Sequence, residues 1–442
     1  MHTYKYSLLS IYISMAASTL ALNLSETLSL ALQQDVSHKQ ARATWLSHTL
    51  DDKIALSSLL PQSTASFESN KYHANNANTA TYRYEKQNLS LSQILFDPEK
   101  IALYTEATID KKIQWLTYQQ HEQNFLVYVA GLYFNLLQAL DNLEYTQAEL
   151  SEYKYRYRLA KEQEASGLIT HTEALQVLAQ MARSEASVIA AERNLRDQKD
   201  LLSQSIGEQP NNISTLDEAS VYQQTIPELA TWVEQSKQHN IAYKISQKQI
   251  DIMQTAKNAA YGSFLPTVTS SFSLSRNQNY PQNGYDISKT NQRSLAITAQ
   301  VPLLTGGKRA MLVAKSWRTL DLAKINNRKT QQDIQVELRE LYYSLQATEE
   351  FIQAEKKAIT ADKELLKMNK IRHDVGAVTL VEILDSISRL RQNQQALAKA
   401  RYSYLTNLLK LKAIAGVIKA SDVQDIDRIL TKKTPIHPTS YD

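Results

Sequence analysis

Residues 375–390 read Val-Gly-Ala-Val-Thr-Leu-Val-Glu-Ile-Leu-Asp-Ser-Ile-Ser-Arg-Leu. Helical patterns flank Gly376 on both sides, so this stretch is predicted to be the tip of a helical hairpin. Glu382 and Asp385 are three residues apart, so their side chains share one face of a helix. The apolar side chains that point another way are Ile383, Ile387 and Leu390. The pattern predicts a helix with two acids on its wet side and a buried stripe on the other.

The same tip occurs once more, earlier in the chain, where residues 166–175 read Ser-Gly-Leu-Ile-Thr-His-Thr-Glu-Ala-Leu. Gly376 follows Gly167 by 209 residues, and Glu382 follows Glu173 by the same number. Gly167 and Gly376 are therefore predicted as the two tip turns, because glycine readily ends a helix. The whole chain reads as two repeats of one order: helix, strand pair, long helix, tip, helix.

Glycines and prolines separate these repeats from the segments around them. The predicted segments are a signal peptide at 1–21, a first repeat at 22–207, an inter-repeat linker at 208–226, a second repeat at 227–416 and a C-terminal segment at 417–442. Strands are predicted at about 64–74, 84–96, 267–280 and 292–304. Helices are predicted at 24–60, 98–165, 172–206, 227–264, 308–372 and 379–415. The polar residues 431–442 are predicted to be a disordered tail.

The start of the chain has the features of a secretory signal. Lys5 supplies the basic start and residues 8–22 are apolar, with cleavage predicted after Ala21 and Ser18 as the alternative position. An uncleaved anchor helix is the other interpretation, although the stretch is short for a span of about 20 residues. The chain has no cysteine, which fits an exported protein. Its net charge of +4 is too small to indicate nucleic acid as a partner.

The predicted helices are too long for an ordinary globular domain. The chain has 442 residues but only nine glycines and nine prolines, so it has few turns. A helix of about 65 residues spans roughly 100 Å, so such helices must pack side by side along their length. The side chains that recur every seventh residue, as coiled-coil packing requires, are Leu390, Leu397, Tyr404 and Leu411.

The predicted strands have one apolar face and one face rich in hydroxyl groups. In residues 267–275, Val268, Phe272 and Leu274 alternate with serines and threonines, and residues 294–301 alternate in the same way. A membrane barrel turns such an apolar face to lipid and its polar face to the lumen. Because four strands cannot close a barrel alone, the sequence predicts an oligomer in which several chains contribute strands.

Short motifs in both repeats indicate a family by their order, spacing and duplication. In the first repeat they are LLPQ at 59–62, LSQILFD at 91–97, YFNLL at 133–137 and YTQA at 145–148. In the second repeat they are FLPT at 264–267, VPL at 301–303, GG at 306–307 and ARYSYL at 400–405. With these motifs, nearly all of the mature chain resembles the TolC-like outer-membrane channels of efflux and type I secretion systems.

The resemblance implies a fold that is mainly α with a small β part. Three chains would form a homotrimer, in which duplicated long-helix hairpins build an α-barrel tunnel and four strands per protomer build a 12-stranded β-barrel surrounded by outer-membrane lipid. The tunnel would extend into the periplasm of a Gram-negative cell. It would be the passive exit duct of a tripartite efflux pump or type I secretion system. An inner-membrane transporter and a periplasmic adaptor protein would open its closed tip.

The resemblance also implies an acidic ring at the narrow periplasmic end of the tunnel. Glu382 and Asp385 fall on the positions of this ring, although the first family acid is usually the shorter Asp. Carboxylates crowded around one axis bind cations and so tune the ion selectivity of a channel. The alternative is that the two acids only solvate a helix face.

Polar bonds between neighbouring hairpins hold the closed tip in this family. Thr172 and Glu173 match the acceptor side of these bonds. On the donor side the usual Tyr is His373 here, and the usual Arg is Val378, so a charged hydrogen bond is lost. Glu173 and His373 are predicted to pair instead, most strongly when the histidine is protonated. A solvated histidine is the alternative.

Three other classes of protein remain as alternatives. A periplasmic coiled-coil adaptor would normally carry compact all-β domains and a hairpin that is not duplicated. A structural coiled coil without a pore would leave the alternating strands unexplained. An enzyme is suggested only by Gly306-Gly307-Lys308 after a strand, where the spacing of a full phosphate loop is missing. No catalysis, cofactor or metal site is predicted, and the sequence leaves the cargo open.

Overall fold

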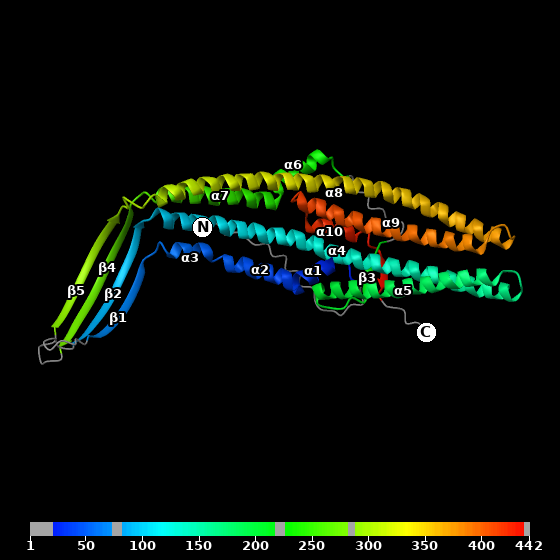
Figure 1. Cartoon of the computed structure of the whole chain (residues 1–442), viewed down its shortest axis with the longest axis horizontal. Helices are drawn as coiled ribbons and strands as arrows, with labels where there is room; N and C mark the ends of the chain where they lie inside the picture. Colours follow the sequence, from blue (N-terminus) through cyan, green and yellow to red (C-terminus); the bar gives the residue numbers. More distant parts are fainter. Residues whose placement is uncertain (1–20, 73–81, 217–225, 282–287, 437–442) are drawn as a thin grey trace.

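The computed structural model describes residues 21–72, 82–216, 226–281 and 288–436. They form a long, bent molecule with a four-stranded sheet at one end and long helices over the rest (Figure 1). The fold class predicted from the sequence, mainly helical with a small β part, is confirmed. The predicted signal peptide lies outside the described residues except for Ala21, whose side chain is buried.

The sheet is antiparallel, and its strands are neighbours in the order β1, β2, β4, β5. Their bounds are Gln62–Tyr72 for β1, Tyr82–Phe96 for β2, Thr267–Pro281 for β4 and Ser288–Gln300 for β5. Each repeat contributes one pair of strands, and β2 pairs with β4 to join the two pairs. Among the described residues, β1 and β5 each have a strand partner on one side only, so they are the edges of the sheet.

The register sorts hydroxyl and apolar side chains into separate rows across the sheet. The hydroxyl row consists of Thr64, Ser90, Ser273 and Ser294. The apolar row next to it consists of Leu91, Phe272 and Leu295. The two rows lie on opposite faces, because side chains alternate along a strand. Phe272 is 39% exposed and Leu295 is 76% exposed, so the described part of the chain leaves the apolar face uncovered.

One strand differs in position from its prediction. The observed β5 lies four residues before the predicted range 292–304, because the polar residues before the alternating pattern also pair, down to Ser288 opposite Asn279. The strand ends before Pro302, whose nitrogen has no hydrogen to contribute to a ladder. The other three predicted strands agree with the observed ones to within two residues at each end.

Two long helical hairpins extend from the sheet. The first consists of α4 (Pro98–Ala165) and α5 (His171–Ile206), and the second of α8 (Lys308–Asp374) and α9 (Leu380–Ile414). α4 has 68 residues and α8 has 67, so each extends for about 100 Å. α4 packs against α9, which gives the side-by-side order α5, α4, α9, α8 (Figure 1). None of the helices in the described ranges has both the length and the apolar character needed to cross a membrane.

The segment 24–60, predicted as one helix, is divided into three. These are α1 (Leu24–Gln34), α2 (Val36–His48) and α3 (Asp51–Ser57). Asp35 makes the first break, because its backbone is extended and its carboxylate accepts a hydrogen bond from the N–H of Ser37 at 2.8 Å. Thr49 and Leu50 make the second break. The prediction of one continuous helix is therefore wrong, since a local cap interrupts the apolar pattern.

The predicted helix 227–264 is divided as well, into α6 (Leu229–His239) and α7 (Ile241–Gly262). Asn240 makes this break, and its side-chain amide donates to the carbonyl oxygen of Ile414 at 2.8 Å. Gly416 lies against the same corner, where an added Cβ would stand only 2.4 Å from the carbonyl oxygen of His239. The end of α9 thus fits closely against the junction of α6 and α7.

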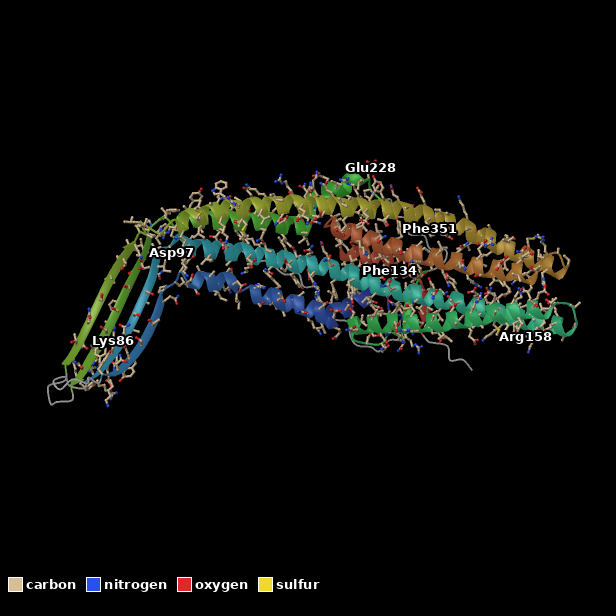
Figure 2. The ribbon with its side chains drawn as sticks, viewed as in Figure 1. Lys86, Asp97, Phe134, Arg158, Glu228 and Phe351 are labelled. Atoms are coloured by element: carbon tan, nitrogen blue, oxygen red, sulfur yellow. The ribbon has the colours of Figure 1, made fainter. Side chains whose placement is uncertain are left out.

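A hydrophobic core in the middle of the molecule joins the two repeats. Its largest fully buried side chains on α4 are Tyr133, Phe134, Leu136 and Leu137. The Phe134 ring stacks on Tyr402 of α9 with centroids 6.2 Å apart, and it lies between the two hairpins (Figure 2). The Tyr133 hydroxyl donates to the carbonyl oxygen of Ser214 at 2.6 Å.

Three short elements beside this core are absent from the sequence prediction. They are β3 (Asn212–Thr215), α10 (Ala420–Asp427) and β6 (Lys432–Pro435), and β3 pairs with β6. The prediction of a disordered tail is wrong for β6, while residues 437–442 lie outside the described chain. Four-residue strands are too short to show a pattern, and Ile213 and Ile436 are ordered by burial in the core.

Candidate functional site

The first helical hairpin turns through a glycine. Gly167 has a φ of +73°, a conformation that glycine adopts without strain. The N–H of Leu168 donates to the carbonyl oxygen of Gln163 at 2.8 Å, and the N–H of Gly167 donates to that of Glu164 at 2.9 Å. These two bonds form a Schellman motif, which satisfies the last carbonyl groups of α4.

A capping box then begins α5. Thr170 Oγ1 accepts a hydrogen bond from the N–H of Glu173 at 3.2 Å. In return, Glu173 Oε2 accepts one from the N–H of Thr170 at 2.8 Å. The first N–H groups of a helix have no partner within the helix, so this exchange stabilises its start.

The second hairpin turns in the same way at the matching positions. Gly376 also has a φ of +73°, and the two Schellman bonds measure 2.9 and 2.8 Å. Thr379 caps α9, where its N–H donates to Glu382 Oε1 at 3.4 Å. Both tips therefore have the spacing Gly-x-x-Thr-x-x-Glu. The Thr-x-x-Glu pattern was visible in the sequence but was not recognised as a capping box.

The two predicted ring acids lie on the exposed side of α9. Glu382 and Asp385 are both exposed to solvent. The side chains on the buried side are Ile383, Ile387 and Leu390. α9 therefore has the wet face and the buried stripe that the spacing predicts. Glu382 also closes the capping box, so part of its role is local, and the ring of acids stays a prediction.

The predicted gate residues make local contacts within the described chain. Thr172 is exposed, and Glu173 binds Thr170. The hydrogen bonds from Thr170 hold the pKa of Glu173 below its ordinary value. His373 Nδ1 lies 3.2 Å from the carbonyl oxygen of Val378, so this nitrogen carries the proton that it donates. One chain therefore does not bring Glu173 and His373 together.

An apolar cluster near the tips holds the two hairpins against each other. Its members are Tyr153 and Ala160 of α4, Val177 of α5, and Leu380, Ile383, Leu384 and Ile387 of α9. The Tyr153 hydroxyl also donates to the carbonyl oxygen of Leu384 at 3.4 Å. We call these seven residues the tip cluster. It is separate from the central core, so the hairpins meet at two distinct apolar contacts.

A charged contact crosses between the hairpins beside the tip cluster. Lys370 Nζ of α8 lies 2.8 Å from Glu152 Oε1 of α4, which also accepts from Arg156 Nη2 at 3.3 Å. Burial opposes ionisation of Glu152, but the hydrogen bonds and charges of Lys370 and Arg156 outweigh it and lower the pKa of Glu152. Sequence reasoning missed this contact because its partners lie in different repeats.

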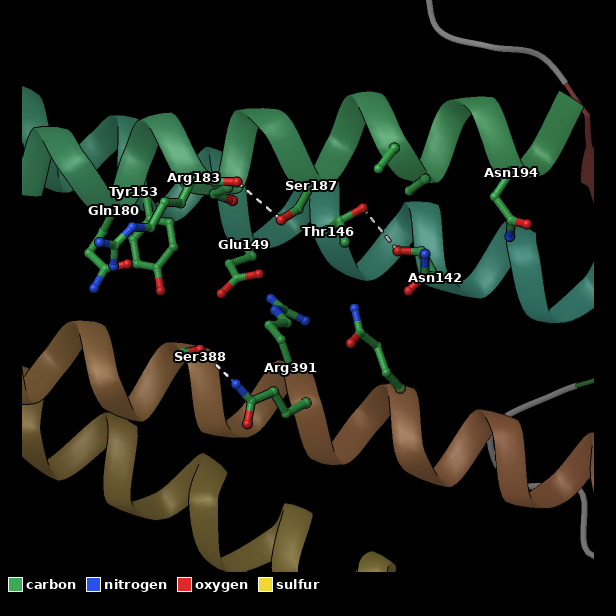
Figure 3. Close-up of a pocket in the computed structure, with 15 residues that line it drawn as sticks. Asn142, Thr146, Glu149, Tyr153, Gln180, Arg183, Ser187, Asn194, Ser388 and Arg391 are labelled. Atoms are coloured by element: carbon green, nitrogen blue, oxygen red, sulfur yellow. Dashed lines mark hydrogen bonds between the residues drawn. The ribbon is translucent and has the colours of Figure 1, made fainter.

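A polar cavity of about 530 Å³ lies between the hairpins, farther from the turns than the tip cluster (Figure 3). Glu149 of α4 and Arg391 of α9 face each other across it. Arg183 of α5 lies on the same side of the cavity as Glu149 (Figure 3). Burial raises the pKa of Glu149, although the Tyr153 hydroxyl and the charge of Arg391 oppose this shift. The surfaces of the two hairpins that face each other across this cavity are therefore polar.

Two residues that line this cavity each have a buried side-chain atom without a hydrogen-bond partner among the described residues. These atoms are the Nε of Arg391 and the Oγ of Ser184. Buried polar atoms of this kind are normally satisfied by water when the space is large enough. The cavity has both the volume and the polar groups that bound water needs. We therefore expect water to fill this part of the contact between the hairpins.

The chain matches the family model described as "Outer membrane efflux protein" over residues 27–208 and 232–417. Outer membrane protein TolC of Escherichia coli (strain K12) is 25% identical over 396 residues, which cover 87% of this chain and 80% of TolC. Alkaline protease secretion protein AprF of Pseudomonas aeruginosa is 23% identical over 348 residues, which cover 76% of this chain and 70% of AprF.

Solved structures have the same fold. CusC superimposes with a TM-score of 0.78 at 16% identity, covering 92% of this chain and 95% of CusC. The outer membrane channel CmeC of Campylobacter jejuni has a TM-score of 0.77 at 18% identity, covering 92% and 90%. The two ranges that match the family model each contain a strand pair and a long hairpin. The chain therefore belongs to the outer membrane efflux protein family and is an outer-membrane channel for efflux or type I secretion.

Proposed function

We propose that three copies of this chain close one β-barrel in the outer membrane and one helical tunnel in the periplasm, which together form a passive exit duct. The observation that carries this proposal is a sheet with one apolar face and two edges, β1 and β5, that have no outer partners among the described residues. A sheet in lipid must close on itself, because lipid offers no hydrogen bonds to edge strands. Three copies supply twelve strands, with the apolar row toward lipid and the hydroxyl row toward the lumen.

The helical layer supports the same arrangement. Its outer helices are α5, from the first repeat, and α8, from the second. Head-to-tail contacts around a threefold axis would bring α8 of one copy beside α5 of the next. Because His373 is on α8 and Glu173 is on α5, their predicted pairing becomes a contact between copies. A protonated His373 would then hold the closed tip more firmly than a neutral one.

Crosslinking tests this arrangement directly, because the chain has no cysteine of its own. We expect the double variant Glu173→Cys, His373→Cys to form a covalent ladder that ends at three chains when treated with a short bis-maleimide. The two single variants are controls and should form no such ladder. A ladder that ends at two chains, or a crosslink confined to one chain, contradicts the arrangement.

The pH dependence of conductance tests the Glu173–His373 pair separately. We expect closure of the wild-type channel to be stronger at about pH 5 than at about pH 8, because a protonated histidine pairs more strongly with a carboxylate than a neutral one does. His373→Ala should remove this dependence. An unchanged pH dependence in the variant would exclude the Glu173–His373 pair but would not contradict the proposed trimer.

Glu382 and Asp385 of three copies would place six carboxylates around the axis. We expect Asp385→Asn and Glu382→Gln to lower cation selectivity in planar bilayers, and the double variant to lower it further. Glutamine is chosen at Glu382 because it can still close a capping box. Glu173→Gln is the control for the loss of a capping carboxylate, since Glu173 has the same capping position at the other tip, and it should leave cation selectivity unchanged even where it alters closure through His373. A protein that never permeabilises a lipid film contradicts the channel itself.

Opening of the tip requires the two hairpins to separate. An adaptor and an inner-membrane transporter would supply the free energy to break the Lys370–Glu152 contact and the tip cluster. Farther from the turns, the polar cavity would add little to the free energy of separating the hairpins, because water can replace the contacts between its polar groups. The transporter would also select the cargo, and a pull-down of the full chain from cell envelopes would identify it.

A reversible crosslink tests this opening movement. We expect the double variant Glu152→Cys, Lys370→Cys to lose export when its cysteines are joined by a reducible, disulfide-containing bis-maleimide, and reduction to restore export. The matched control is Asp362→Cys, Asn393→Cys, which the same reagent links from α8 to α9 within one hairpin, where Asn393 Nδ2 lies 2.6 Å from Asp362 Oδ2. This control should export normally when linked. Export through the linked Glu152–Lys370 variant would show that the hairpins need not separate.

A further inference from the structure

A histidine and two aspartates from three different helices meet between the central core and the sheet. His48 ends α2, Asp51 begins α3, and Asp110 belongs to the part of α4 that packs on them. One donor atom from each of the three side chains lies within 4.8 Å of the other two. His48 Nδ1 is itself 2.7 Å from Asp51 Oδ2. No part of the proposed duct uses these residues.

Contacts on both sides hold the three helices together at this point. The rings of Trp45 on α2 and Trp115 on α4 have centroids 5.2 Å apart. Lys111 Nζ of α4 lies 3.0 Å from Asp52 Oδ2 of α3. These neighbours fix the helix backbones from which the donor groups project, so the cluster is already assembled before any ligand binds.

We propose that His48, Asp51 and Asp110 bind one zinc-type divalent ion. Imidazole nitrogen and carboxylate oxygen are both ordinary zinc donors, and three protein ligands leave a fourth position for water. Calcium and magnesium take oxygen ligands, so the imidazole disfavours them. Gln114 Nε2 donates to Asp110 Oδ2 at 3.4 Å, an outer contact of the kind that orients a metal ligand.

The electrostatics and the access of the cluster also suit such an ion. The two carboxylates together match the charge of a divalent ion, whereas one histidine can neutralise only one of them. The side chains of His48 and Asp51 are 37% and 41% exposed, so an ion can enter from solvent. The contact between His48 and Asp51 is an ordinary pair of residues three positions apart, but it leaves the position of Asp110 beside them unexplained.

An ion at this site would clamp the junction of α2 and α3 onto α4. Thr49 and Leu50 interrupt the helix there, so the junction lacks the continuous hydrogen bonding of a helix. α3 leads directly into β1, an edge strand of the sheet. Binding would therefore stabilise the part of the chain from which this edge strand starts.

Calorimetric titration of the full-length, detergent-solubilised and metal-free protein with zinc chloride tests the proposal. We expect saturable binding of one ion per chain, and a weakening of affinity by about tenfold or more in Asp110→Asn and in His48→Gln. Zinc chloride should also raise the thermal unfolding midpoint of the wild type but not that of Asp110→Asn. Magnesium chloride should have neither effect.

Two control variants separate this site from other carboxylates. Asp251→Asn removes an acid of α7 that pairs with Lys248 Nζ at 2.8 Å, and His171→Gln removes a similar histidine–acid pair, His171 Nδ1 to Glu164 Oε1 at 2.6 Å. Both should bind zinc like the wild type. The proposal is overturned if the wild type shows no saturable binding, if Asp251→Asn weakens it as strongly as Asp110→Asn, or if only His171→Gln loses it.

Discussion

The two tips of the molecule share one backbone design but differ in their surfaces. Both turn on a glycine with a φ of +73°, and both begin the next helix with a capping box. At the first tip, His171 is exposed and pairs with Glu164. The residue 209 positions later is Leu380, whose side chain is buried in the tip cluster.

The two tips also differ in their acidic residues. Asp385 of the second tip corresponds to Gln176 of the first, so only the second tip carries two acids on one face. Ile383 of the second tip, which is fully buried, corresponds to Ala174 of the first. The duplication thus preserves the turn, which any hairpin needs. The side chains around the turn differ between the repeats, so that matching positions pack in the interior at one tip and contact solvent at the other.

The largest expected difference between the tips is in packing. Ile383→Ala should lower the free energy of unfolding by about 3 kcal/mol, because its side chain is 0% exposed and lies in the tip cluster. Leu175→Ala at the first tip should cost about 0.5 kcal/mol or less, since Leu175 is 48% exposed. Denaturant unfolding followed by circular dichroism measures both. Equal costs would show that the tips do not differ in packing.

The turns should show the opposite result, a cost that is the same at both tips. Gly167→Ala and Gly376→Ala should each cost about 1–2 kcal/mol, because an L side chain is strained at this φ even though, apart from the glycine and its chain neighbours, no described atom lies within 4 Å of the added Cβ. Gly131→Ala is the control, since Gly131 lies within α4 with equal space around it and alanine favours a helix. It should stabilise the protein slightly. Clearly unequal costs at the two tips would break the comparison.

The smallest expected effect is the pH dependence of the first capping box. The pKa of Glu173 is lowered, so its stabilising contribution is present above the ordinary carboxylate pKa and disappears as pH falls through the lowered value. Glu173→Gln should therefore lower the thermal midpoint slightly at neutral pH and have no effect in strong acid. Thr170→Ala should abolish this dependence, because Thr170 supplies the hydrogen bonds. A difference that persists in strong acid would assign the effect to another group.

Local and repeated features were predictable from the sequence. The spacing around Gly167 and Gly376 appears twice, and strand alternation fixes which side chains share a face, so the hairpins and the sheet follow from short patterns. Contacts between distant segments were not predictable. Lys370 meets Glu152, and Asn240 meets Ile414, only because helices from different parts of the chain pack together. The breaks at Asp35 and Asn240 were missed because the apolar pattern continues past them.

The contact between Gly416 and the carbonyl oxygen of His239 has a mechanical consequence. A Cβ at this position would meet that oxygen, so the base of α9 fits tightly against the junction of α6 and α7, which suits this corner as the pivot of a tilt. The 35 residues of α9 then act as a lever about 50 Å long. A tilt of about 10° would displace its far end by about 9 Å. A small rearrangement at the corner would thereby be amplified into a wide displacement at the tip of this hairpin.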